Sequence, residues 1–524
     1  MTSESATRFV PTIDREASSQ RRWKVTGLVL LALVALLMFG TLSHYGMTWD
    51  EEFHNTYGEY VLAWFESGFK DHRSLDYKNS YIYGALFDVV ALLFARISPL
   101  GLYEDRHLVN VAFGILALAG TWRLGTLILG ARGGVLAMGL TVLTPMFYGH
   151  TFNNPKDIPF ATLFVWTLYY LYESARPLPA VSTRATIKLC VALGAMLAAR
   201  PGGIFFVAYI VVWWSLSLWR AGAARREVHR AIGALVLVGL GAWVLMLSLW
   251  PWGQVNPIIH PLAGIAIASR FSYAMTTLFN GQQVPALHPP LSYLPTWFSL
   301  QLPEIYLVAL MAGILGLLFS RHRRPRPELA FLGFVVLFPV ATAMILRSTL
   351  YDAVRHFLFV IPPLAVLAAA GLESGLRQSV PRIVRIAIAT AAVAAAALTA
   401  RDMIVLHPYE SLYFNRLIAG GLPGVSGRFE TDYWGISYRE ALDWVESNVP
   451  GEGIRIANCS NALQTSYYLR GAEGARFVPV SRDDNPDLLL ATTRWDCHLK
   501  PQARVLHTVE RQGVALSYVL DLRR

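Results

Sequence analysis

The sequence predicts an α-helical polytopic membrane protein of about eleven spans that ends in a small extracytoplasmic α/β domain. Three observations predict this fold class. Hydrophobic residues make up 54% of the 524 residues and charged residues only 15%, whereas soluble domains are nearer one quarter charged. Apolar runs long enough to cross a bilayer recur from Val25 to about residue 400. Lys and Arg gather in every second connection between these runs, as the positive-inside rule expects of cytoplasmic loops.

The excess of basic residues also limits the function classes. Lys and Arg number 45 against 35 Asp and Glu, a formal net charge of +10. A basic chain is usually considered first as a nucleic-acid binder. Here the basic residues lie where they set membrane orientation, so no nucleic-acid partner is predicted. The high hydrophobicity excludes a disordered chain, and three cysteines are too few for a disulfide scaffold.

The first span is predicted over residues 25–42, an almost unbroken apolar run. It is long for a signal-peptide core, and no small-x-small cleavage site follows it. Residues 1–24 therefore form an uncleaved cytoplasmic N-terminus. Its basic residues are Arg8, Arg15, Arg21, Arg22 and Lys24.

Ten further apolar runs complete a membrane domain over residues 25–400. They lie near 108–126, 133–148, 158–172, 186–200, 204–219, 231–249, 301–319, 329–346, 356–372 and 384–400. The basic connections, all on the side of the N-terminus, hold Arg123 and Arg132; Arg176, Arg184 and Lys188; Arg220, Arg225, Arg226 and Arg230; Arg321, Arg323, Arg324 and Arg326; and Arg377, Arg382 and Arg385. An odd number of spans then places the chain from residue 401 outside a plasma or inner membrane.

Two long loops and the tail are predicted on the outer side. Residues 46–107 hold ten acidic residues against five basic ones, and the apolar stretch 82–99 within them is an interfacial or re-entrant helix. Residues 250–300 form a second loop, rich in Pro, His and aromatic residues.

The tail divides into a motif segment, 401–450, and an α/β domain, 451–524. Strand-like runs are Ile454–Ala457, Arg476–Val480, Leu488–Ala491 and Val514–Leu520, with a helical pattern at 438–447. Cys459 and Cys497 both lie in this domain, where a disulfide is compatible with the compartment. Spacing alone leaves their pairing open.

The first candidate catalytic group directly follows the first span. The run Thr48-Trp49-Asp50-Glu51-Glu52 has the pattern of a capping box that opens a helix, with Thr48 as N-cap and Glu51 at the third helical position. Helix capping explains these residues by itself. The functional alternative is that Asp50 is a general base at the membrane surface, since a helix N-terminus holds a carboxylate firmly.

A second acid is predicted on the same face. In Asn153-Asn154-Pro155-Lys156-Asp157, Asn154 as N-cap and Pro155 at the first helical position make a good helix start. Capping does not explain Lys156 and Asp157, and ionisable groups beside a membrane are often functional. Asp50 and Asp157 together make a carboxylate pair available.

Basic residues at three outer span ends run against the positive-inside bias. These are Lys156, Arg200 and Arg355, the last within Tyr351-Asp352-Ala353-Val354-Arg355-His356. An isolated Arg is usually a snorkelling side chain. Three together suit an anionic group at the outer leaflet, such as a lipid phosphate.

No cofactor is predicted with certainty. His44, His54, His260, His288 and Glu304 leave a divalent metal open, but no dense ligand motif such as His-Glu-x-x-His occurs. No P-loop, nucleophile elbow or dinucleotide fingerprint is present. A donor already activated in the membrane therefore fits better than one bound from the cytoplasm.

Taken together, these residues resemble the GT-C membrane glycosyltransferases, which include the protein O-mannosyltransferases and the bacterial lipid A aminoarabinose transferase. A family-39-like bacterial branch is the nearer resemblance. It rests on Asn154-Pro155-Lys156-Asp157-Ile158-Pro159, Tyr351-Asp352-Ala353-Val354-Arg355-His356-Phe357-Leu358, His407-Pro408-Tyr409-Glu410, Phe414-Asn415 and Asp432-Tyr433-Trp434-Gly435-Ile436-Ser437-Tyr438-Arg439-Glu440.

The resemblance implies an enzyme that moves a hexosyl or pentosyl group from a polyprenyl-phosphate carrier, with inversion, at the outer face. Asp50 would be the general base, Asp157 its supporting acid and Glu51 the second acid of the first loop. By their charge and position, rather than by the resemblance, Lys156, Arg200 and Arg355 are the candidates for binding the carrier phosphate. Tyr351 and His356 are predicted to bind substrate or phosphate beside them. The acceptor would be a hydroxyl of a lipid, an envelope glycan or a protein. Protein is the less favoured acceptor, because loop 250–300 is too short for the β-trefoil insertion of the protein mannosyltransferases.

Two other function classes compete with the enzyme. A transporter or flippase of lipid-linked sugars would place ionisable residues near the bilayer midplane, often in paired repeats. The notable ionisable residues here cluster at outer span ends, and no repeat is seen. A scaffold whose tail binds partners would make Asp50, Asp157 and Arg355 dispensable.

Overall fold

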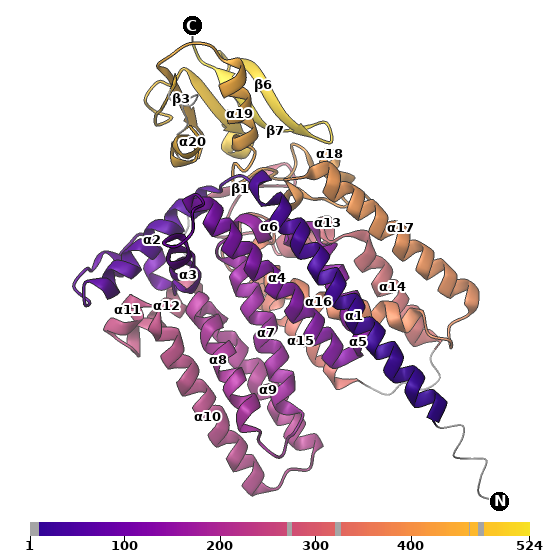
Figure 1. The fold of residues 1–524 in the computed structure, drawn as a ribbon. Coiled ribbons are helices and arrows are strands. Elements are labelled where there is room, and N and C mark those ends of the chain that lie inside the picture. The colour runs from indigo at the N-terminus through magenta and orange to yellow at the C-terminus, as the bar shows by residue number, and fades with distance from the viewer. Residues whose placement is uncertain (1–9, 270–274, 320–325, 461, 470–475, 524) are drawn as a thin grey trace, which may run out of the picture.

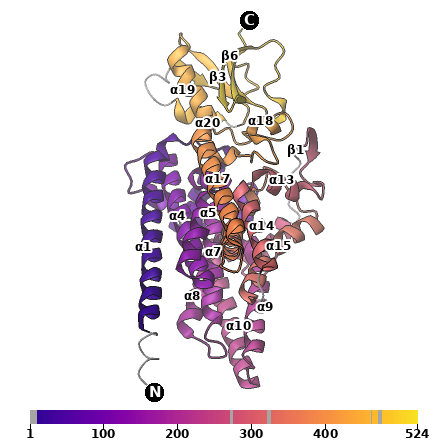
Figure 2. The same cartoon turned by 90° about the vertical axis from the view of Figure 1, so that its right-hand side faces the viewer.

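A computed structural model of the chain describes residues 10–269, 275–319, 326–460, 462–469 and 476–523. It has two parts, a large helical bundle and a small mixed sheet that lies on one end of it (Figures 1 and 2). The chain is thus a multi-pass helical protein with a C-terminal α/β domain, as predicted. Arg8, Arg321, Arg323 and Arg324 of the predicted basic segments lie outside the described residues.

Seven described helices are long and apolar enough to cross a membrane. α9 and α16 reach this length with a 3₁₀ helix before them, Pro201–Phe205 and Arg355–Val360. Large apolar side chains such as Leu240 and Val393 are 61% and 70% exposed, which suits hydrocarbon better than water. The seven are α1 (Val10–Thr41), α4 (Leu102–Leu129), α9 (Phe206–Arg220), α10 (Arg225–Ser248), α15 (Pro327–Ile345), α16 (Ile361–Gly375) and α17 (Arg382–Leu406).

Two bent helix pairs raise the number in the described residues to nine if each pair is one span. α5 (Ala131–Val142) and α6 (Pro145–Asn153) meet at 70°, and α13 (Tyr293–Gln301) and α14 (Glu304–Leu318) at 99°. Both breaks carry a proline, Pro145 or Pro303, which disfavours a helical conformation in the residue before it.

In the described part of the chain, two of the eleven predicted spans do not pass the test of length and apolarity. These two are helices, α7 (Asp157–Ala175) and α8 (Thr183–Ala199). α8 has only 17 residues. α7 packs between α4 and α8 and is buried on most sides, so protein rather than lipid surrounds its polar side chains.

The first predicted outer loop folds into two helices. α2 (Trp49–Glu66) begins with the predicted capping box, in which Glu51 Oε2 accepts the Thr48 backbone N–H at 2.7 Å. α3 (Leu86–Ala95) has ten residues and is about 15 Å long, which is too short to span. The buried Asp88 of α3 pairs with Arg106 of α4 at 2.6 Å.

The second predicted outer loop also contains regular structure. Two short helices lie beside α2 and α3, and a two-stranded antiparallel hairpin follows them. These elements are α11 (Pro251–Val255), α12 (Ile259–Ser269), β1 (Thr276–Phe279) and β2 (Gln282–Pro285).

The C-terminal domain has a five-stranded sheet of order β4-β3-β5-β7-β6. β3 is parallel to β4 and β5, and β7 is antiparallel to β5 and β6. The strands are β3 (Ile454–Asn458), β4 (Phe477–Pro479), β5 (Leu488–Thr492), β6 (Arg504–Arg511) and β7 (Val514–Asp521), with helices α18 (Gly421–Val425), α19 (Tyr438–Asn448) and α20 (Ala462–Tyr468). Four of the strands were predicted. β6 was missed because it is an edge strand with little buried apolar surface.

A disulfide joins Cys459, after β3, to Cys497, after β5. The C-terminal domain packs against the segment that precedes α2. Gln464 Nε2 donates to Met47 O at 2.9 Å, and the Met47 N–H donates to Tyr468 Oη at 2.5 Å. These bonds fix the chain just before Asp50.

Candidate active site

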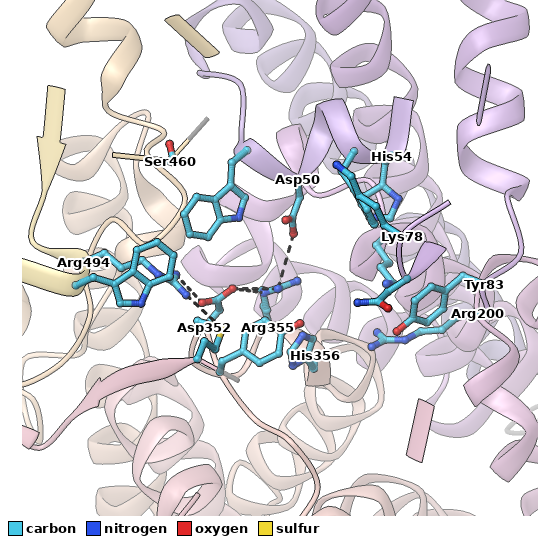
Figure 3. A pocket seen from close by; sticks show the side chains of 17 residues that line it. Asp50, His54, Lys78, Tyr83, Arg200, Asp352, Arg355, His356, Ser460 and Arg494 are labelled. Carbon is cyan, nitrogen blue, oxygen red and sulfur yellow. Dashed lines mark hydrogen bonds and ion pairs between the residues drawn. The ribbon is translucent and has the colours of Figure 1, made fainter. Parts of the chain in front are cut away.

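A cavity of about 480 Å³ lies where the helical bundle meets the C-terminal domain (Figure 3). The start of α2, the start of α7, the segment before α16 and the loop after β5 all contribute to its walls. Six of the eight predicted site residues line it: Asp50, Lys156, Arg200, Tyr351, Arg355 and His356.

The first turn of α2 separates its two acids. Asp50 lines the cavity, and its carboxylate is 31% exposed. Glu51 does not line the cavity. Its buried carboxylate accepts the Thr48 N–H and pairs with His107 Nε2 at 3.0 Å. The structure therefore places Glu51 in the support of α2 and Asp50 in the space that a substrate would fill.

Asp157 lies directly behind the cavity wall. Its Oδ1 accepts from Arg200 Nη1 at 2.8 Å, and its Oδ2 pairs with Arg355 Nη1 at 3.3 Å. Helix α7 begins at Asp157 rather than at the predicted Pro155. The N-cap is Lys156 rather than the predicted Asn154, but Asn154 still supports the start of the helix, because its Oδ1 accepts the N–H groups of Lys156 and Asp157. Asp157 thus orients two arginines that line the cavity.

Arg355 is the centre of the charge network. It is buried and contacts three carboxylates: Asp352 at 3.0 Å, Asp157 at 3.3 Å and Asp50 at 3.8 Å. The backbone before it is strained, since Asp352 and Ala353 have φ values of +54° and +58°. Non-glycine residues rarely adopt this region, and such strain clusters at functional sites. The contacts of Asp352 hold the loop in this conformation.

Two lysines bring positive charge to the cavity without a carboxylate partner among the described residues. Lys156 Nζ lies 3.4 Å from the centre of the Tyr83 ring, and Lys78 Nζ lies 5.3 Å from that of Phe53. Burial lowers the pKa of Lys156, because an ammonium group loses solvation there. Uncompensated cations of this kind favour the binding of an anion.

The C-terminal domain completes the site with residues that were not predicted. Arg494, after β5, is buried, and its Nη1 donates to Asp352 Oδ1 at 2.7 Å. Its guanidinium lies 4.7 Å from the Trp49 ring and 4.8 Å from that of Trp495. Burial opposes the charge of Arg494, but Asp352 and Glu430 together raise its pKa. An Arg-Asp-Arg chain thus connects the C-terminal domain to Arg355 (Figure 3).

The cavity is positively charged overall. Five basic side chains line it, against the carboxylates of Asp50 and Asp352. In the described part of the chain, no three His, Cys, Asp or Glu side chains gather as metal ligands would. The sequence left a divalent metal open, and assays with and without EDTA test whether the activity depends on one.

Comparisons with known proteins show similarity of fold. No family model and no curated protein sequence matches the chain. Among solved structures, apo ArnT from Cupriavidus metallidurans matches with a TM-score of 0.51 at 15% identity, over 95% of this chain and 98% of that one. The same enzyme bound to undecaprenyl phosphate gives 0.50 at 16% identity, over 94% and 97%.

A second similar protein is the archaeal oligosaccharyltransferase AglB from Archaeoglobus fulgidus, in complex with an inhibitory peptide and a dolichol-phosphate. It matches with a TM-score of 0.50 at 12% identity, over 90% of this chain and 69% of that one. ArnT, a lipid A aminoarabinose transferase, and AglB are both GT-C fold glycosyltransferases. This chain therefore has the GT-C fold.

Proposed function

We propose that this protein is a glycosyltransferase that moves a sugar from a polyprenyl-phosphate carrier to an acceptor hydroxyl. One observation carries the proposal. The partly exposed carboxylate of Asp50 faces the same cavity as Lys78, Lys156, Arg200 and Arg355. A base next to an anion-binding surface is what transfer from a phosphate leaving group to a hydroxyl requires.

Asp50 suits the role of general base better than the other two acids. Both oxygens of Asp157 are occupied, by Arg200 and by Arg355. Both oxygens of Asp352 are also occupied, by Arg494 and Arg355. Asp50 has one charged contact among the described residues, at 3.8 Å to Arg355. Its carboxylate therefore remains available to accept the proton of an acceptor hydroxyl.

The basic side chains then stabilise the departing phosphate. As the bond between the sugar and the phosphate breaks, negative charge grows on the phosphate oxygens. Lys156 and Arg200 already lie on the cavity wall, so little reorganisation is needed when that charge appears. Tyr351 and His356, packed edge to face at 4.8 Å, form the adjoining wall. Direct displacement by the acceptor inverts the anomeric centre and needs no carboxylate nucleophile.

The similar structures support a lipid-linked donor in general terms. ArnT was solved with undecaprenyl phosphate and AglB with a dolichol-phosphate. We keep the acceptor as a lipid, an envelope glycan or a protein. Mass spectrometry of envelope glycolipids and glycoproteins in a deletion strain, searched for one missing sugar, identifies both sugar and acceptor. An unchanged glycan profile would count against the enzyme.

We further propose that the cavity faces the outside of a plasma or inner membrane. The basic connections that precede α10 and α17 lie at the end of the bundle away from the C-terminal domain (Figure 1). By the positive-inside rule that end is cytoplasmic. Reporter fusions at residues 225 and 450 are expected on opposite faces, with 450 outside. The same face for both would contradict this orientation.

A transporter of lipid-linked sugars is the alternative function. A transporter needs Asp50 and Lys156 only if they bind its cargo, whereas the enzyme needs them for the reaction itself. Purified protein in detergent separates the two functions, because transfer from donor to acceptor there needs no second compartment.

The lowered pKa of Lys156 predicts a pH effect. If its ammonium group binds the carrier phosphate, activity is present below the lowered pKa and falls as the pH rises through it. Lys156→Arg keeps the positive charge at alkaline pH and is expected to move the alkaline limb of kcat/KM upward. Lys70→Arg, at an exposed site outside the cavity, is the control. An unchanged alkaline limb in Lys156→Arg would exclude Lys156 as the group that titrates.

A further inference from the structure

A second cavity lies at the other end of the bundle, where the C-terminal ends of α4, α7 and α9 meet the start of α15. Its volume is about 550 Å³, close to that of the candidate active site. None of the residues discussed for transfer lines it. It therefore needs a role of its own.

Two arginines at the rim give this cavity its charge. Arg176 follows α7 and Arg220 ends α9, and both are exposed. Neither is ion-paired with a carboxylate in the part of the chain that the structure describes. Arg176 Nη2 donates to the backbone oxygen of Leu127 at 2.7 Å, which holds its guanidinium at the cavity. Among the described residues that line the cavity, Glu328 is the single acid.

A buried donor points independently to a ligand. Trp213 of α9 lines the cavity and is 6% exposed. Its indole N–H has no acceptor among the described residues, although buried polar groups almost always have one. The ring is held by stacking on Phe331, with centroids 4.7 Å apart, and by Tyr172 at 4.8 Å. It is therefore not free to turn toward water.

The remaining walls are mostly apolar, with side chains such as Leu127 and Leu216. On α9, Val211 and Val212 precede Trp213 in the chain and are 51% and 43% exposed, which suits contact with lipid. A soluble anion would gain nothing from such walls. A phospholipid would place its phosphate at the arginines and the start of its acyl chains along the leucines.

We propose that this cavity binds the headgroup of an anionic phospholipid. Arg176 and Arg220 contact the phosphate, and the Trp213 N–H donates to a phosphate or ester oxygen. Basic pockets between transmembrane helices on the cytoplasmic side are known to hold acidic headgroups. The site does not depend on the proposed glycosyltransferase activity, since it lies at the opposite end of the molecule.

The test uses the full-length protein purified in detergent and then mixed with phosphatidylglycerol or phosphatidylcholine. Native mass spectrometry measures the fraction of protein that retains one lipid. Wild type is expected to retain phosphatidylglycerol several-fold more than phosphatidylcholine, and Arg176→Gln/Arg220→Gln is expected to lose that preference. The matched control Arg225→Gln/Arg226→Gln removes the same charge from the same end, outside the cavity, and should keep it.

A third variant, Trp213→Phe, retains the ring and removes only the N–H. It is expected to weaken retention without changing the thermal unfolding of the lipid-free protein. In a further experiment, inorganic phosphate is added to compete with the bound lipid. Displacement of the lipid by millimolar phosphate would show a site for a soluble anion and overturn the proposal. Equal retention of the two lipids, or equal loss in both double variants, would also overturn it.

Discussion

Asp50→Asn is expected to abolish sugar transfer while leaving expression and thermal unfolding unchanged. The amide has nearly the shape of the carboxylate but cannot accept a proton, and loss of a positioned base typically costs about 10²–10⁴-fold in rate. The side chain is 31% exposed and does not support the start of α2, which Glu51 does. The measurement is single-turnover transfer from a polyprenyl-phosphate sugar by the purified variant.

Glu66→Gln is the matched control for this loss. Glu66 lies at the other end of α2, where its exposed carboxylate pairs with the exposed Arg96. It should transfer at the wild-type rate. Glu51→Gln separates the two acids of the first turn, because it should lower the unfolding temperature through the lost contact with His107. Normal turnover by Asp50→Asn would contradict the assignment of Asp50 as the general base.

The second large effect is expected at Arg494. Arg494→Gln leaves the buried Asp352 with one cationic partner in place of two, and breaking a buried ion pair costs about 3–5 kcal/mol. Arg355 then loses the rigid support of Asp352, and displacement of a positioning group by about 1 Å can cost 100-fold in rate. We expect kcat to fall, with a smaller change in the KM for the donor, because Arg494 acts through Arg355.

A double variant distinguishes positioning from mere stability. Arg494→Gln/Asp352→Asn also removes the buried carboxylate that lost one of its two partners, so the free energy of unfolding should recover part of the loss. Transfer should stay low, because Arg355 still lacks the carboxylate that orients it. Arg482→Gln, exposed in the same domain beside Asp483, should leave both quantities unchanged. If activity recovered together with stability, the role of Arg494 would be structural only.

Much of the fold could be predicted because the membrane imposes simple constraints on sequence. Apolar runs and alternating basic connections placed every long helix, and alternation of apolar residues placed most of the C-terminal strands. The bends at Pro145 and Pro303 could not be predicted, since hydropathy averages over a break in a helix. Hydropathy also gave no sign that α7 packs between α4 and α8 with its polar side chains buried in protein.

The site was predictable where its residues follow span ends. Asp50, Lys156 and Arg200 each lie near the end of a predicted apolar run, so local sequence marks them. Arg494 has no such signal, because only the folding of the C-terminal domain onto the bundle brings it to Asp352. Asp352 lies in the motif Tyr351-Asp352-Ala353-Val354-Arg355-His356, which the sequence does show. Its pairing with Arg355 and Arg494 depends on three-dimensional contacts that the sequence does not show.

The packing of the C-terminal domain against the segment before α2 has a consequence for the synthesis of the protein. The hydrogen bond from Gln464 to Met47 joins residues 417 positions apart. At roughly 5–20 residues per second, the ribosome needs about 20–80 s to reach the second of them after the first. During that interval the nascent chain has inserted Asp50 but has no closed cavity around it. If the chain is the proposed glycosyltransferase, a chain that terminates early would therefore be inactive, and transfer would begin only after the C-terminal domain has packed against the start of α2.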